Sequence, residues 1–319
     1  MGRTGALADR EVMRLVAELY YERDLRQPEV AAMTGFSVSK VSRLLTAARE
    51  QGIVRISVEP APEGRPAVAE ELERRFGVEI RITPGQERDP AAATRLAGVG
   101  AADHVGPWIP ERGTIGIASG YTVAALVSAL PRMRRPEVTV VPIVGGWDTQ
   151  NPYLDSNQVA RRMADRIGAQ TRTLHAPAVL DTPEMKAALL REPTVATTTA
   201  LWDGLELALI GVGGRPEAYP GYRTAVDRLG DASRRELQEL RVIGDLAGHF
   251  FRADGTFVDA WSSRTLAIPR ESLATVRRVV AVAAGSSKAA PILAALRTGL
   301  VHALITDRPT AEAALKLAG

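Results

Sequence analysis

Hydroxyl-bearing and basic side chains gather in one short stretch near the start of the 319-residue chain. The stretch opens with Ser37, and its other polar members are Ser39, Lys40, Ser42, Arg43 and Thr46. Short hydroxyls and cations at the start of an exposed helix are suited to contacting the base edges and phosphates of DNA. The stretch therefore predicts recognition of a nucleic acid rather than catalysis.

Two short helices joined by a tight turn would present these side chains. Residues 27–33 form a first helix, and Gly35 can take the positive φ that a turn between helices needs. Ser37 is suited to capping the second helix. That helix would bury one apolar face, made of Val41, Leu44, Leu45 and Ala48. The pattern predicts a helix-turn-helix, and Gln27 would contact phosphate from the start of the first helix.

Elements on both sides complete the predicted DNA-binding domain. Residues 9–21 are amphipathic, with Val12, Leu15, Val16 and Leu19 on one side, and predict a supporting helix. Residues 53–56 alternate between apolar and polar side chains, as one strand of a winged helix-turn-helix would. The alternative is an ordinary helical hairpin with a merely solvated polar face.

A second group of polar residues follows a predicted strand at 114–118. Gly120 lets the backbone approach a ligand closely, and Ser119 and Thr122 supply hydroxyls beside Tyr121. Amide groups at the start of the next helix favour an anion, for which phosphate is the obvious choice. The alternative is an ordinary turn between strand and helix that happens to contain glycine and threonine.

Lys288 stands at the start of another predicted helix, after the small residues 284–287. A lysine opposes the helix dipole there, but a bound phosphate would reverse that cost. A solvated surface lysine is the alternative. Three further segments follow a predicted strand or mark a loop that could line a pocket: Gly145 and Gly146, residues 211–214, and Asp245, which could accept hydrogen bonds from a sugar hydroxyl. Each is also consistent with simple turn chemistry, and Asp307 with a cap on the last helix.

The elements that would position these loops alternate along the chain. The expected strands are 79–82, 114–118, 138–143, 205–210, 276–282 and 301–305. The expected helices are 91–105, 123–130, 157–167, 184–191, 234–240, 288–298 and 310–317. Nearly continuous apolar strands between helices predict an α/β fold with a Rossmann-like, mostly parallel sheet covered on both faces, and residues 249–259 add a hairpin.

The predicted organisation has two domains and a linker. Residues 1–59 form the helix-turn-helix domain, residues 60–77 the proline-rich linker and a linker helix, and residues 78–319 the larger α/β domain. The linker helix could equally pair with a copy of itself. Ligands of open parallel sheets bind beyond the carboxyl ends of the strands, where the glycine-rich loops fall.

Composition excludes several classes of protein. The chain has no cysteine, which excludes disulfides and thiolate chemistry, and it has no apolar run or leader that predicts membrane insertion or export. A cytoplasmic protein is therefore expected. The net charge of +3 limits DNA binding to a local surface. The four histidines are scattered, no catalytic motif is present, and neither a metal nor a cofactor is predicted.

Taken together, these residues resemble the SorC/DeoR-type family of bacterial sugar-responsive transcription regulators. The resemblance covers almost the whole chain, from residues 20–54 through Gly116 to Thr122, the Gly145–Gly146 pair and Asp245 to Lys288 and Asp307. It implies an effector domain that resembles ribose-phosphate isomerases and glucosamine-phosphate deaminases but acts as a sensor and in oligomerisation. It also implies that Ser119, Gly120, Tyr121, Thr122 and Lys288 hold a phosphate or its equivalent, while Asp245 and the Gly145–Gly146 region meet the sugar.

The expected partners are operator DNA, a small carbohydrate, polyol or sugar-phosphate effector, and further copies of the chain as a homodimer or homotetramer. Relatives that bind phosphosugars can carry an arginine where this chain has Val144, so both phosphorylated and free effectors stay open. The rival interpretation is a sugar-phosphate isomerase or deaminase that uses Asp245 as its acid or base. A scaffold without a ligand is the third, and the glycine-rich loops disfavour it.

Overall fold

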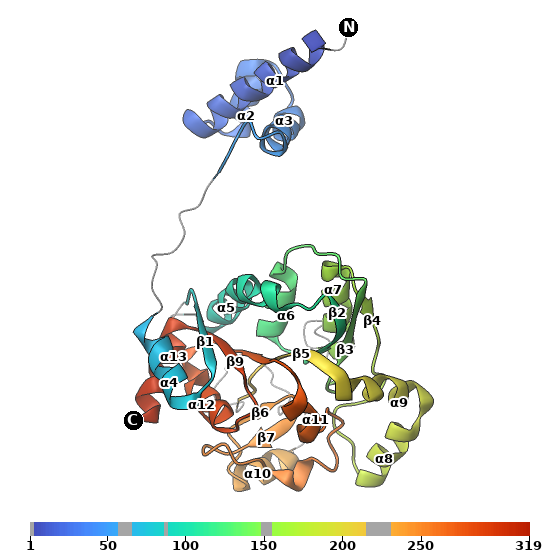
Figure 1. The fold of residues 1–319 in the computed structure, drawn as a ribbon. Helices are drawn as coiled ribbons and strands as arrows, with labels where there is room; N and C mark the ends of the chain where they lie inside the picture. The colour runs from blue at the N-terminus through green and yellow to red at the C-terminus, as the bar shows by residue number, and fades with distance from the viewer. Residues whose placement is uncertain (1–2, 57–65, 86–88, 148–154, 215–230) are drawn as a thin grey trace. The chain divides into compact units, whose positions relative to one another are not determined.

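The computed structural model describes residues 3–56, 66–85, 89–147, 155–214 and 231–319. The chain divides into two compact units, Met1–Gly64 and Arg65–Gly319 (Figure 1). Of the proline-rich stretch 59–66 that was predicted as the boundary, all but Pro66 lies outside the described residues.

The first unit is helical. Its elements are α1 (Arg3–Ala17), the π-helical turn η1 (Glu18–Glu22), α2 (Gln27–Thr34) and α3 (Val38–Glu50). Its small core contains Met13, Val16, Ala17, Leu19, Val30, Ala31, Val41, Leu45 and Ala48. The predicted apolar face of α3 is therefore confirmed. The predicted face of α1 was wrong at Leu15, whose exposed fraction is 47%, because Met13 and Ala17 face the core instead.

The turn between α2 and α3 forms as its residue types predict. Gly35 ends α2 with φ at 71°, a left-handed conformation that glycine adopts without strain. The amide of Lys40 donates to Ser37 Oγ at 3.2 Å, so the predicted cap is confirmed. The predicted strand at residues 53–56 was wrong: Ile53 donates its amide to the carbonyl of Ala48, and its side chain packs on the core of this unit.

Replacing Ser37 by alanine should destabilise the first unit by about 1 kcal/mol, because the start of α3 loses its side-chain cap. All four tryptophans lie in residues 108–261, within the second unit. The variant should therefore lower the thermal midpoint of the helical circular dichroism signal and leave that of tryptophan emission unchanged. Ser42→Ala, an exposed site on the same helix, is the matched control. Equal midpoints for the two variants would contradict the capping role.

The second unit is built on a seven-stranded parallel sheet in the order β1-β9-β8-β5-β2-β3-β4. Its strands are β1 (Glu79–Thr83), β2 (Arg112–Ile117), β3 (Glu137–Pro142), β4 (Gln170–Thr171), β5 (Leu205–Ile210), β8 (Val279–Val282) and β9 (Ala303–Asp307). Its helices are α4 (Ala67–Phe76), α5 (Pro90–Val105), α6 (Tyr121–Ala129), α7 (Ser156–Ile167), α8 (Pro183–Arg191), α9 (Pro193–Thr199), α10 (Asp231–Glu239), α11 (Arg270–Thr275), α12 (Ala289–Arg297) and α13 (Arg308–Ala318). The α/β sheet predicted from the alternating pattern is confirmed.

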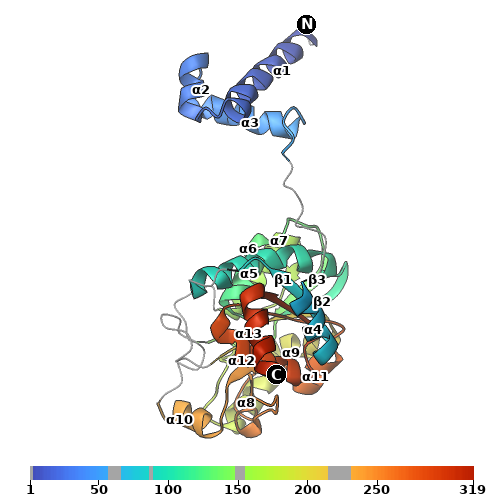
Figure 2. The ribbon, with the colours of Figure 1, turned by 90° about the vertical axis from the view of Figure 1, so that its left-hand side faces the viewer.

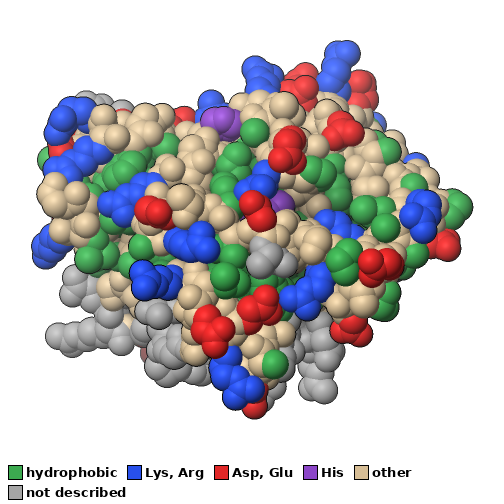
Figure 3. Space-filling view, turned by 90° about the horizontal axis from the view of Figure 1, so that it is seen from below, with side chains coloured by type: hydrophobic (Ala, Val, Ile, Leu, Met, Phe, Trp, Pro, Cys, Tyr) green, Lys and Arg blue, Asp and Glu red, His purple; other side chains and the backbone are tan. Residues whose placement is uncertain are grey.

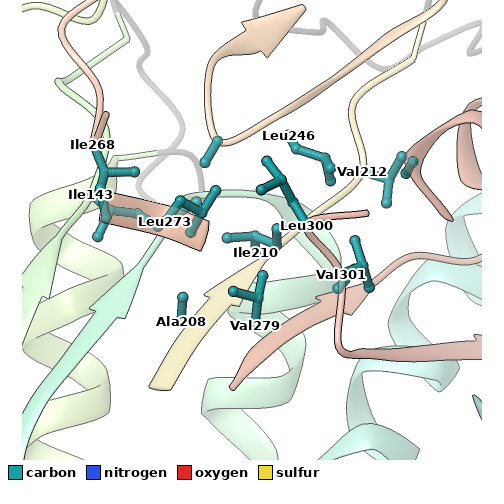
Figure 4. Close-up of a cluster of buried hydrophobic side chains, with 14 of the residues drawn as sticks. Ile143, Ala208, Ile210, Val212, Leu246, Ile268, Leu273, Val279, Leu300 and Val301 are labelled. Carbon is teal, nitrogen blue, oxygen red and sulfur yellow. The ribbon is translucent and has the colours of Figure 1, made fainter. Parts of the chain in front are cut away.

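Alternate residues of the central strands enter two separate cores. Leu207 and Leu209 of β5 face the layer of α5, α6 and α7, whereas Ala208 and Ile210 face the layer of α11, α12 and α13. Figures 1 and 2 show helices on both sides of the sheet, and Figure 4 shows Ile210 and Val279 among the side chains of the second core. Burial on both faces explains why these strands read as continuous apolar runs.

The hairpin predicted at residues 249–259 is present. Phe251 forms an antiparallel bridge with Phe257, and the amides of Arg252 and Val258 donate to the carbonyls of Thr256 and Phe250. A second hairpin, which was not predicted, precedes it and pairs β6 (Gly244–Leu246) with β7 (His249–Phe251). Its turn is made by Ala247 and Gly248, which have positive φ, at 48° and 84°.

Helix α4 belongs to the second unit. Val68, Ala69 and Leu72 are buried there, and the helix packs against α13 and β1. The apolar face that was noted as a possible site for a second copy is therefore covered within the chain.

Candidate functional site

The carboxyl ends of β2 and β5 lie at the point where the chain reverses its direction across the sheet. Strand β2 is followed by β3 on one side, whereas β5 is followed by β8 on the other. The connections leave this point in opposite directions, and such a point in an open α/β sheet is where ligands bind. The amide of Ala118 donates to the carbonyl of Leu209 at 2.9 Å, which fixes the start of the loop after β2 beside β5.

The loop after β2 opens toward this point. Gly120 has φ 156° and ψ 154°, a region that essentially only glycine occupies, and a Cβ there would meet no atom within 4 Å. The start of α6 carries no side-chain cap, so its first amides remain suited to an anion. Ser119, Tyr121 and Thr122 are half-buried beside it. The structure thus places the three other predicted residues of this loop beside the open Gly120.

Lys288 precedes α12 at the end of the loop after β8. Its ammonium donates to the carbonyl of Val212 at 2.6 Å, directly after β5. Burial lowers the pKa of Lys288 to about 8, and the nearby carboxylate of Asp245 partly opposes that shift. Gly285, with φ at 104°, donates its amide to the buried Thr310 hydroxyl at 2.8 Å. Lys288 is therefore not a solvated surface lysine.

Asp245 lies on β6 against the same segment. Its carbonyl accepts from the amide of Gly213 at 2.9 Å, and its Oδ2 accepts from the amide of Gly248 at 3.1 Å. Burial raises the pKa of Asp245, while the Gly248 amide and the charge of Lys288 oppose the rise. The structure thus brings together residues 212–213, Asp245 and Lys288, which lie far apart in the sequence.

Gly145 and Gly146 occupy a tightly packed crossing after β3. The amide of Gly145 donates to Leu266, and a Cβ on Gly145 would lie 2.5 Å from the carbonyl oxygen of Pro177. Gly146 donates to Ala176 and accepts from Ala178. Close backbone packing accounts for Gly145, which we therefore leave out of the proposed effector contacts, whereas a Cβ on Gly146 would lie 3.7 Å from the nearest atom, and the effector role of Gly146 stays a prediction. Asp307 caps α13 by accepting from the amide of Thr310 at 3.1 Å, as predicted.

Gly213 has no room for a side chain. A Cβ there would overlap Asp245 Oδ1, so Gly213→Ala should displace the carboxylate and lower the free energy of unfolding by about 1–3 kcal/mol. Urea unfolding followed by tryptophan emission measures the change. Gly211→Ala is the matched control, because a Cβ at Gly211 meets no atom within 4 Å. Equal stability of the two variants would show that Asp245 is not held against Gly213.

In the first unit, the predicted DNA-contacting side chains share an exposed surface. Ser39, Lys40, Ser42 and Arg43 are exposed on the first two turns of α3. The Lys40 ammonium lies 3.9 Å from the centre of the Phe36 ring, and Arg43 Nε donates to the carbonyl of Ser39 at 3.4 Å. Gln27 is half-buried at the start of α2, and the hydroxyl of Ser37 is occupied by the cap.

Sequence reasoning missed two parts of the site. Gly248 and Thr310, which hold Asp245 and Gly285, were not singled out. For Gly248 a signal was available, because Ala247-Gly248 between two apolar runs has the pattern of a two-residue hairpin loop. For Thr310, a hydroxyl buried inside α13, the sequence contains no such signal. In the described residues no group of three or more His, Asp or Glu is placed to hold a metal ion, and no helix there has the length and apolarity to cross a membrane.

Comparison with known proteins identifies the family. The family model of the sugar-binding domain, Sugar-bind, matches residues 61–316. The sorbitol operon regulator of Klebsiella pneumoniae is 30% identical over 314 residues, which cover 94% of this chain and 96% of that protein. The erythritol catabolism regulatory protein EryD of Brucella abortus is 29% identical over 318 residues, which cover 96% of each.

The fold agrees with that family. The crystal structure of full-length SorC from Klebsiella pneumoniae matches with a TM-score of 0.72 and 29% identity, and the match covers 96% of this chain and 98% of that chain. These relatives are regulators, so the isomerase or deaminase alternative is rejected and the chain is not an enzyme. The chain belongs to the SorC/DeoR-type family of bacterial transcriptional regulators, in which a sugar-binding domain controls a DNA-binding domain.

Proposed function

We propose that this regulator binds operator DNA through residues 1–59 and a carbohydrate effector through residues 78–319, while α4, within the predicted linker 60–77, is packed on the effector unit. One observation carries the effector half of the proposal. Lys288 and Asp245, of opposite charge, both lie against residues 212–213 beyond the carboxyl end of β5, at the switch point of the sheet. A charged donor and a charged acceptor side by side can orient a polyhydroxylated ligand.

The two parts of the effector would meet different residues. A phosphate, or the oxygens that take its place, would lie at the start of α6 between Gly120 and Lys288. The carboxylate of Asp245 would accept hydrogen bonds from sugar hydroxyls. Val144 is a buried, uncharged side chain whose backbone bridges Ala267, so position 144 supplies no cation for a phosphate. A free sugar or polyol therefore remains as compatible with the site as a phosphorylated one.

In the first unit, Ser39, Lys40, Ser42 and Arg43 would contact the DNA. Their exposure on one face of α3 supports this role. Ser37 would act chiefly through its cap, and Gln27 would reach phosphate from the start of α2. Few positive charges stand on one copy of this surface, so we propose that two or four copies bind paired half-sites. Sedimentation velocity with and without DNA measures the number of copies, and a monomer on DNA would contradict this part.

The test of the proposed function is a thermal-shift screen of the purified full-length protein against sugars, polyols and their phosphates, because a ligand that binds only the folded state raises the midpoint. The compound found should also change the affinity for a DNA sequence that the protein has selected from a random library. A compound that raises the midpoint but leaves DNA affinity unchanged would contradict control by that effector. No stabilising compound in the panel would contradict the effector site.

The affinity for an anionic effector should fall roughly tenfold per pH unit above about pH 8, because Lys288 then loses its proton. Burial holds the pKa of this lysine below its ordinary value, so the charge that attracts the anion is fully present only below pH 8. Isothermal titration at pH 7 and pH 9 measures the change. A constant affinity across this interval would show that the ammonium of Lys288 does not contact the effector.

A further inference from the structure

The second unit contains a cavity of about 530 Å³ that the proposed effector site does not use. It lies between α8, α9, α11 and the hairpin strand β7, and it includes Lys186, His249 and Arg270. None of the predicted effector residues lines it. Its volume falls within the range of small-molecule sites. We call it the α8–α11 cavity.

The cavity is lined by two cations and two acids, and the cations are the less exposed of the four. Lys186 is half-buried, its ammonium donates to the carbonyl of Ser262 at 2.7 Å, and within the described residues it forms no ion pair. Arg270 is also half-buried, and it shares its charge with the largely exposed Asp259 at 2.7 Å. Glu271 and Asp203, the two acids of the lining, are both exposed, and Asp203 already accepts from the hydroxyl of Ser272. The buried side of the cavity is therefore cationic.

His249 adds a polar group without adding a negative charge. Its Nε2 donates to the carbonyl of Ile268 at 2.7 Å, which fixes the orientation of the ring. Burial lowers the pKa of His249, and the charges of Arg270 and Lys186 lower it further, while the bond to Ile268 and the charge of Glu271 oppose the shift. The imidazole is thus neutral near pH 7, and Lys186 and Arg270 act on the same small volume.

The remaining walls suit a small organic molecule. Trp202 and Leu190 provide apolar surface, and Thr199 provides a hydroxyl. Lysine and arginine side chains are scattered among acidic ones on the face of the unit that lies underneath in Figure 1, so the cationic site is a local feature and not part of a broad basic surface (Figure 3). We propose that the α8–α11 cavity binds a small anion, a carboxylate or phosphate group on a compact carbon skeleton, through Lys186 and Arg270.

This site shares a wall with the one that contains Asp245. In the hairpin, Leu246 pairs with His249, and the amide of Gly248 donates to the Asp245 carboxylate. A Cβ on Gly248 would lie 3.1 Å from Thr265, which lines the cavity. The same turn therefore contacts both places.

The experiment uses the full-length protein with two probes, inorganic phosphate and malonate, each titrated at constant ionic strength against chloride. Lys288→Met removes the cation of the effector site, so the part of the remaining rise of the thermal midpoint that depends on Lys186 reports the cavity. We expect the rise to persist in Lys288→Met and to need about tenfold more anion when Lys186→Met is added. A larger response to phosphate would indicate a phosphate group on the natural ligand, and a larger response to malonate would indicate a carboxylate.

Two further variants separate binding from folding. Lys186→Arg keeps the cation and should keep the response. Ala196→Phe, at a half-buried position of the lining, fills the cavity without changing its charge and should abolish the response. Circular dichroism and tryptophan emission establish that each variant is folded. The proposal is overturned if neither probe stabilises Lys288→Met, or if adding Lys186→Met and adding Ala196→Phe both leave the response unchanged.

Discussion

Arg43→Ala should lose most of the affinity for a DNA sequence selected by the unaltered protein while keeping its response to the effector. Arg43 is exposed on α3, and among the described residues its side chain bonds only weakly, to the carbonyl of Ser39. Each lost hydrogen bond from an arginine to DNA is worth about 1.5–3 kcal/mol. With two copies on paired half-sites, as proposed, this contact is lost twice, so the affinity should fall by about a hundredfold or more.

The variant also tests whether the two units act as separate modules. Arg277→Ala is the control, because its side chain is 82% exposed and lies in the second unit. Fluorescence anisotropy with the selected DNA measures the affinity, and the thermal shift measures effector binding. Unchanged DNA binding in Arg43→Ala would remove α3 from the recognition surface. Loss of the effector response in the same variant would contradict the modular interpretation.

Lys288→Met should abolish the response to the effector and leave the ligand-free protein no less stable at pH 7. Truncating one member of a buried charge pair at a binding site removes about 2–5 kcal/mol of binding free energy. The low pKa of Lys288 means that its charge opposes folding below pH 8, and methionine removes that charge with a similar chain length. DNA binding without the effector should remain.

Lys316→Met is the matched control, because that lysine is exposed on α13. Isothermal titration with the compound found in the screen measures the affinity. An unchanged affinity in Lys288→Met would move the effector away from residues 212–213. A large loss of stability without any ligand would show instead that the bond to Val212 is mainly structural.

Local patterns predicted much of the fold and part of the candidate site. The strand and helix alternation, the cap at Ser37 and the turn at Gly35 depend on neighbours in the sequence and were read from it. The loop after β2 and Lys288 were found because a small-residue loop between a strand and a helix leaves a local pattern. Their convergence near β5 followed from the rule for parallel sheets.

The remaining features depend on contacts between distant segments. Leu15 was misplaced because helical periodicity allows neighbouring faces, and the packing of α1 against α3 selected Met13. Gly145 looked like ligand chemistry, but the close backbone of Pro177 explains it. The α8–α11 cavity left no signal, because its lining comes from segments that are separated by as many as 85 positions, from Lys186 to Glu271.

The backbone around the proposed effector site is held by hydrogen bonds to groups that the ligand does not need to contact. The amide of Ala118 donates to the carbonyl of Leu209, and that of Gly285 to the hydroxyl of Thr310. Side chains at positions 119 and 122 can therefore change during evolution without disturbing this frame. Such an arrangement would let one scaffold acquire new effectors by a few substitutions, so that the preference for one sugar over another evolves largely independently of folding.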